Sequence, residues 1–215
     1  MNDMPAAIPQ SKPTSMGSAW RSKHCSLGIV LAVAGLAIAA CGRTYVPGSN
    51  EQIPSLRDLY PQALEMAQIW TTDAHLIWAE VSMEALPEVV FAFNSVSDPG
   101  EGALVHVEEP ADQPRFWLEE VPAPGRTEAL PAIELPSWGS LDSPTAYSIS
   151  LDQGGKEFLE RNPGTRASWI RLQYVDTPSG GGINWRVTFG DPLSVTYDVL
   201  IDPSTGEVVQ SEESP

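Results

Sequence analysis

The chain has 215 residues, enough for one ordinary domain or two small ones, and it carries 28 acidic against 12 basic side chains. Three of the basic residues and one acid precede Cys41, so the part from Cys41 onward has 27 acids, 9 bases and a formal net charge of −18. Such a surface repels phosphate backbones, which excludes nucleic acid as an expected partner, and it offers no basic patch to an anionic bilayer.

Residues 26–40 form an uncharged, apolar run that follows the basic residues Arg21 and Lys23 and ends in small residues. This order of features is typical of a signal peptide, and we expect residues 1–40 to be one. The alternative is an uncleaved membrane anchor. The run is too short for that role, because a bilayer core of about 30 Å needs roughly 20 apolar residues.

The end of the run resembles the lipobox of bacterial lipoproteins. Ile38, Ala39 and Ala40 stand at the positions that the signal peptidase recognises, and Cys41 stands at the invariant cysteine. The resemblance implies that the thiol of Cys41 receives a diacylglycerol and that the chain is cut just before it. Two or more acyl chains give stable anchoring, since each buried CH₂ contributes about 0.8 kcal/mol. The implied location is extracytoplasmic and lipid-anchored to the cell membrane, with inner and outer membrane both left open.

Residues 41–54 hold the lipidated cysteine and a stretch of Gly, Pro, Ser and Asn that indicates a tether. In residues 55–121, apolar residues at helical spacing predict a helix over 55–70. Four strand-like runs follow: His75–Ser82, Glu88–Ser95, Ala103–Glu108 and Arg115–Val121. Residues 122–142 contain four prolines and indicate a second linker.

Residues 143–211 repeat this order. Ser143 and Pro144 predict the start of a helix, Gly154 and Gly155 interrupt it, and the stretch 162–164 ends it. Four more strand-like runs follow: Ala167–Asp176, Ile183–Gly190, Ser194–Asp202 and Glu207–Gln210. Residues 212–215 are left as a tail. The expected fold is α+β, with two tandem modules, each one helix followed by a four-stranded antiparallel sheet. An internal duplication and convergent patterning both explain the repeat.

The second half also resembles the C-terminal part of PepSY domains. Trp185–Phe189 carries a W-x-V pattern, and Tyr197–Val209 runs through a hairpin of the form Y-x-V-x-I-D-x-x-T-G-E-V. The first half departs from this pattern, because PADQP at 110–114 replaces DPSTG and no W-x-V is present. The resemblance implies an extracytoplasmic α+β module associated with protein binding or peptidase restraint, and it implies no catalytic residue.

Few residues indicate a catalytic or metal-binding site. Only His75 and His106 follow Cys41, and no HExxH or CxxC occurs, so we expect no metal and no cofactor. No G-x-S-x-G is present, and acylation of Cys41 would exclude cysteine catalysis. The acid pairs at 108–109 and 119–120 leave a glycosidase-like carboxylate pair open, although such groups are mostly solvated surface. Asp202 and Ser204 indicate a capped turn rather than a calcium loop.

Six tryptophans follow Cys41. Four of them, Trp70, Trp78, Trp169 and Trp185, lie at core-like positions, whereas Trp117 and Trp138 lie near the end of the first half and in the expected linker. These two could line a groove between the halves, although packing in the core is the favoured alternative.

We therefore expect a lipid-anchored, extracytoplasmic binding or interaction module of the bacterial cell envelope, with no catalysis. Its partners would be the membrane, through the N-terminal lipid, and an unidentified envelope protein or peptide that an open sheet edge could accept as an added strand. Two alternatives stay open: a carrier of apolar ligands with a cavity between helix and sheet, and a carboxylate-based envelope hydrolase.

The leader before Arg21 is long for a signal peptide and contains Pro5, Pro9 and Pro13. We therefore expect translation to start at Met16. Peptide mapping of the precursor tests this expectation: no peptide from residues 1–15 should be found, and any such peptide would exclude a start at Met16.

Overall fold

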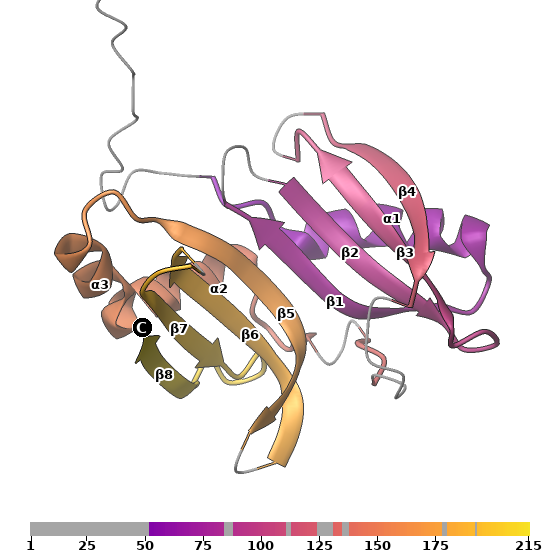
Figure 1. Cartoon of the computed structure of the whole chain (residues 1–215). Coiled ribbons are helices and arrows are strands. Elements are labelled where there is room, and N and C mark those ends of the chain that lie inside the picture. Colours follow the sequence, from indigo (N-terminus) through magenta and orange to yellow (C-terminus); the bar gives the residue numbers. More distant parts are fainter. Residues whose placement is uncertain are drawn as a thin grey trace, which may run out of the picture. The chain divides into compact units, whose positions relative to one another are not determined.

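The computed structural model describes residues 52–83, 88–110, 113–123, 131–134, 138–177, 180–191 and 193–215 (Figure 1). Ile38, Ala39, Ala40 and Cys41 lie outside the described residues, as does most of the tether. The described residues all belong to one compact unit. None of the helices in this part of the chain is long and apolar enough to cross a bilayer.

Eight strands form one antiparallel sheet in the order β4-β3-β2-β1-β5-β6-β7-β8 (Figure 1). The strands are β1 (Ala74–Ser82), β2 (Glu88–Ser95), β3 (Glu101–Glu108), β4 (Arg115–Pro122), β5 (Ala167–Thr177), β6 (Gly180–Gly190), β7 (Thr196–Ile201) and β8 (Val208–Ser214). All eight lie where alternating apolar residues predict them, within a few residues at each end. The expected tail at 212–215 is mostly strand, because β8 continues to Ser214.

The prediction of two tandem modules is wrong. β1 pairs with β5 over five residue pairs, from Trp78 opposite Gln173 to Ser82 opposite Trp169, and this ladder joins two four-stranded meanders into a single sheet. Left apart, the meanders would each expose an edge strand with unpaired backbone groups. Joining β1 to β5 satisfies those groups, so the energetic gain favours one sheet over two.

Three α-helices cover one face of the sheet (Figure 1): α1 (Leu56–Trp70), α2 (Ser143–Ser150) and α3 (Lys156–Arg161), with a turn of π-helix, η2 (Leu151–Gly155), between the last two. The Oγ of Ser55 caps α1 by accepting a hydrogen bond from the Asp58 N–H at 3.0 Å. The cap of α2 is Asp142, one residue before the serine that the sequence indicated.

The break at Gly154 and Gly155 is confirmed. Gly154 has φ +112°, a left-handed conformation that side-chain-bearing residues rarely adopt. A Cβ on Gly155 would lie 2.6 Å from the ring of Phe189 in β6. The two glycines therefore let the chain turn from α2 into α3 while it stays in close contact with the sheet.

The N-termini of α1 and α2 are tied to each other. Buried Ser143 donates through its Oγ to the carbonyl oxygen of Pro54 at 2.6 Å and accepts from the Leu56 N–H at 3.1 Å. Asp142 accepts from the Arg57 N–H at 3.2 Å, and the Arg57 guanidinium donates to the Gly139 carbonyl at 2.6 Å. Groups that a lone helix would leave unsatisfied are thus paired across the two halves.

The stretch 122–142, expected to be a linker, supplies part of the core. Ile133 is buried and donates its N–H to the Leu76 carbonyl at 2.8 Å. Trp138 has no exposed surface, and its ring centroid lies 5.2 Å from that of Tyr60 in α1 and 6.5 Å from that of Trp185 in β6. Trp138 therefore bridges the two halves inside one core instead of lying in a flexible connection.

Trp138→Ala should lower the free energy of unfolding by about 3–5 kcal/mol, because it removes a fully buried ring and leaves a cavity. Urea denaturation followed by circular dichroism measures this change. Trp117→Ala is the matched control, since Trp117 is 41% exposed and its loss should cost about 1 kcal/mol or less. Equal losses in the two variants would contradict the bridging role of Trp138.

Candidate functional site

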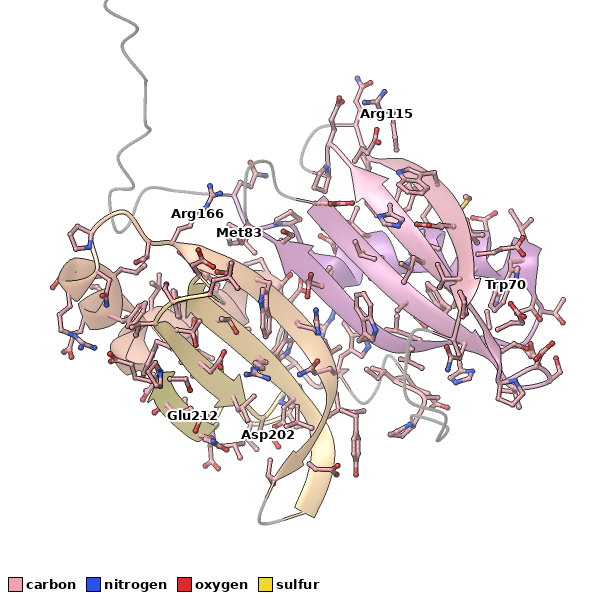
Figure 2. The ribbon with its side chains drawn as sticks, in the orientation of Figure 1. Trp70, Met83, Arg115, Arg166, Asp202 and Glu212 are labelled. Atoms are coloured by element: carbon pink, nitrogen blue, oxygen red, sulfur yellow. The ribbon has the colours of Figure 1, made fainter. Side chains whose placement is uncertain are left out.

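The side of the sheet that faces away from the helices, which we call the outer face, is not covered by any other described element (Figure 1). The register places one row of side chains across all eight strands of this face: Trp117, His106, Val90, Glu80, Arg171, Arg186, Leu200 and Gln210. In Figure 2, Arg115 in β4 and Glu212 in β8 lie toward opposite edges of the sheet. The outer face is thus continuous across the join between the two meanders.

Aromatic and guanidinium groups alternate at the centre of the outer face. The guanidinium carbon of Arg171 lies 5.0 Å from the ring centroid of Trp78 and 4.9 Å from that of Trp169. The guanidinium carbon of Arg186 lies 5.3 Å from the ring of Trp169. Such cation–π contacts contribute about 0.5–2 kcal/mol each, depending on how far water is excluded. The four side chains form a rigid ladder across β1, β5 and β6.

Each arginine of the ladder also has a carboxylate partner. Arg171 forms an ion pair with Glu80 across the β1–β5 join, and the Glu80 side chain is only 16% exposed. Arg186 pairs with Asp198 at 2.6 Å, and Asp198 also accepts a hydrogen bond from Thr188. Because these carboxylates are largely desolvated, removal of either arginine would leave a poorly solvated charge without its partner.

A second aromatic pair lies toward the β4 edge. The rings of His106 and Trp117 are stacked, with centroids 3.9 Å apart and planes within 2° of parallel. Nδ1 of His106 lies 3.0 Å from the Glu88 carboxylate, and Nε2 lies 3.4 Å from that of Glu119. The two carboxylates contact His106, and the His106 ring in turn packs against Trp117, which stays partly exposed to solvent.

Among the hollows at the surface of the described residues are two small ones. The first, of about 180 Å³, is on the outer face of β5 to β8 and is lined by Val175, Asp176, Arg186, Asp198, Leu200, Gln210 and Glu212. The second, of about 240 Å³, lies at the start of α1 between residues 52–59 and Pro110. Drug-sized ligands occupy mostly apolar pockets of about 300–1,000 Å³, so neither hollow has the size or lining of such a site.

The structure does not bring Trp117 and Trp138 together. Trp117 projects from the outer face of β4, whereas Trp138 is in the core on the helix side, as its alternative interpretation held. The described residues contain no groove lined by both rings. Trp185 lies in the core as expected, but Trp78 and Trp169 are half-buried on the outer face, which the sequence did not indicate.

The other acids named from the sequence have structural explanations. Arg115 pairs with Glu109 at 2.7 Å and Glu108 at 3.4 Å, and all three side chains are more than half exposed. Asp202 accepts hydrogen bonds from the Ser204 and Thr205 N–H groups, which lower the pKa of its carboxyl and confirm the capped turn. No three potential metal ligands gather anywhere in the described part of the chain.

Comparison with known proteins adds no family to these observations. No protein-family model, curated protein or solved structure matches this chain.

A double-mutant cycle of Glu80→Gln and Arg171→Met should give a coupling energy of about 1–3 kcal/mol, because this pair is partly buried and spans the β1–β5 join. Urea unfolding of the four proteins measures it. The exposed pair Arg161–Glu213 is the control and should couple more weakly, because water screens it. A Glu80–Arg171 coupling no larger than the control would show that the pair does not strengthen the join.

Proposed function

We propose that this protein is a lipid-anchored, extracytoplasmic interaction module of the bacterial cell envelope, and that the outer face of its sheet contacts an envelope protein or peptide. The observation that carries the proposal is this uncovered, aromatic and charged face, which extends over all eight strands. No catalytic step is proposed.

The sequence before the described residues supports the extracytoplasmic, lipid-anchored location. An apolar run at 26–40 follows basic residues, and Ile38, Ala39 and Ala40 precede Cys41 in the order of a lipobox. A diacylglycerol on Cys41 would hold the domain at a membrane surface. The tether from Gly42 to Glu51 would then span at most about 35 Å when fully extended, which keeps the domain close to envelope partners.

The composition of the outer face supports a macromolecular partner. Tryptophan and arginine are the residue types most enriched where binding energy concentrates in interfaces, and both occur at the centre of this face. The side chains of the ladder and their carboxylate partners contact one another in the absence of a partner, which would lower the entropic cost of binding. A sheet face that contacts only solvent carries mainly polar side chains, whereas this one also carries tryptophans.

The two hollows give less support to the two alternative functions, a carrier of apolar ligands and a carboxylate-based hydrolase. Both include charged or polar side chains in their lining, which disfavours an apolar ligand. The carboxylates of the first hollow include Asp198, which is engaged by Arg186 and Thr188 and so is poorly placed to act as a general acid or base.

A cross-linked pull-down of the lipidated protein from its native membranes, analysed by mass spectrometry, tests the proposal. We expect a reproducible partner that is lost with Cys41→Ala, because without the lipid the domain no longer stays at the membrane. No partner from membranes in which the protein is abundant, or the same proteins captured by Cys41→Ala, would contradict the proposed function.

Within the same experiment, Trp117→Ala should reduce capture of the partner, since it removes an exposed ring from the outer face. Leu193→Ala is the matched control, because Leu193 is 95% exposed but lies in the loop between β6 and β7. Equal capture by the two variants would exclude Trp117 from the contact.

A further inference from the structure

The sheet ends in two different edge strands. Among the described residues, β4 pairs with β3 only and β8 pairs with β7 only, so each presents one row of backbone groups without a strand partner. Exposed edges of this kind can accept an added strand from another chain. How well each edge could accept a partner strand depends on the regularity, side chains and charge of its edge strand.

The β8 edge is protected against strand addition. Its register with β7 shifts between Leu200 and Ile201, so Val209 has no opposite residue and the strand is bulged. A bulge twists an edge strand and interrupts its row of hydrogen-bonding groups. Glu213 of β8 is also engaged by Arg161 of α3 at 2.7 Å.

The β4 edge has a regular ladder. Its eight residues pair with β3 in unbroken register, from Arg115 opposite Glu108 to Pro122 opposite Glu101. Proline lacks an N–H, so Pro122 ends the stretch that could pair with another strand. The free side of β4 therefore offers a continuous template over residues 115–121.

The side chains of β4 supply contacts on both faces of an added strand. Trp117 projects on the outer face and is stacked against His106 on its β3 side, which leaves its other side facing the position of an added strand. Phe116 and Leu118 are half-buried on the helix side and pack against the core. A partner strand would extend both the outer row and the core by one member.

Charge limits which strand can bind. Glu119 and Glu120 are both exposed, and no ion pair to Glu120 occurs among the described residues. At its N-terminal end, β4 carries Arg115, which is already engaged by Glu108 and Glu109. The edge is therefore net acidic, which repels acidic strands, including a second copy of this one, and favours a basic strand. A lysine or arginine opposite Trp117 would also gain a cation–π contact.

From these contacts we infer that the β4 edge binds an extended, basic segment of a partner protein by strand addition, with cationic side chains against Trp117 and Glu119 on the outer face. This inference rests on the proposed function, because it names the edge and the partner chemistry of the same interaction module.

The test uses the mature lipidated protein, from Cys41 onward, in detergent and a synthetic eight-residue peptide that alternates arginine with threonine. Its matched control replaces arginine with glutamate. Calorimetric titration should show binding of the arginine peptide at least about tenfold tighter than that of the glutamate peptide. Hydrogen exchange should slow at the amides of residues 115–121. No binding of the arginine peptide, or protection confined to β8, would overturn the inference.

Two charge-reversal variants test whether the peptide binds at the β4 edge or is attracted only by the net negative charge of the protein. Glu119→Lys combined with Glu120→Lys should weaken binding of the arginine peptide by about tenfold or more, whereas Glu212→Lys combined with Glu213→Lys makes the same charge change on β8 and should leave binding unchanged. All four positions are exposed, so both variants should fold. An equal loss in both would mean that net charge alone attracts the peptide, which contradicts a site on β4.

Two N-methylated versions of the arginine peptide test backbone pairing. In an extended peptide, successive N–H groups point to opposite edges, and each version carries N-methyl groups along one edge only. Only the peptide whose methyl groups face β4 should lose binding, because an N-methyl group removes the donor and blocks the ladder. If both peptides bind as well as the unmodified one, strand addition is excluded even though the charges attract.

The membrane pull-down distinguishes failure of this inference from failure of the proposed function. A partner captured by the wild type and equally by the Glu119→Lys, Glu120→Lys variant would overturn the β4 site while the interaction function stands. Loss of that partner in this variant, with retention in the β8 variant, is the result expected for strand addition at β4.

Discussion

β1 and β5 pair over five residues, and this ladder decides the architecture of the domain. It places Trp78 and Glu80 of the first meander beside Gln173 and Arg171 of the second, so that a cation–π contact and an ion pair form across the join. Both meanders lose an exposed edge at this line, which leaves β4 and β8 as the two ends of one sheet. The uninterrupted outer face exists only because the join is a backbone ladder.

The helix side strengthens the same join. Ser143 and Asp142 at the start of α2 bind backbone groups at the start of α1, and Trp138 fills the core between Tyr60 and Trp185. The hydrogen bonds between the two helix starts link residues that are more than eighty positions apart in sequence. A mutation in one half should therefore destabilise the other half as well, since the two share a core and a sheet.

Local features of the fold could be predicted from the sequence, and its long-range pairing could not. Alternation of apolar residues placed all eight strands, and Gly154 with Gly155 marked the break between α2 and α3. The β1–β5 ladder joins strands that are separated in the chain by β2, β3, β4 and the helices α2 and α3, and no local pattern specifies which edges meet. The proline-rich stretch suggested a linker, although its apolar residues Ile133 and Trp138 are buried.

The function proposed here depends on that single sheet, because the outer face and its two unlike edges follow from it. The β1–β5 pairing is tested most directly by nuclear Overhauser contacts between the two strands in isotope-labelled protein. If β1 pairs with β5, cross-strand contacts join the backbones of Ala79 and Leu172 and those of Glu80 and Arg171. Contacts within each meander but none between β1 and β5, with the two meanders tumbling independently, would contradict it.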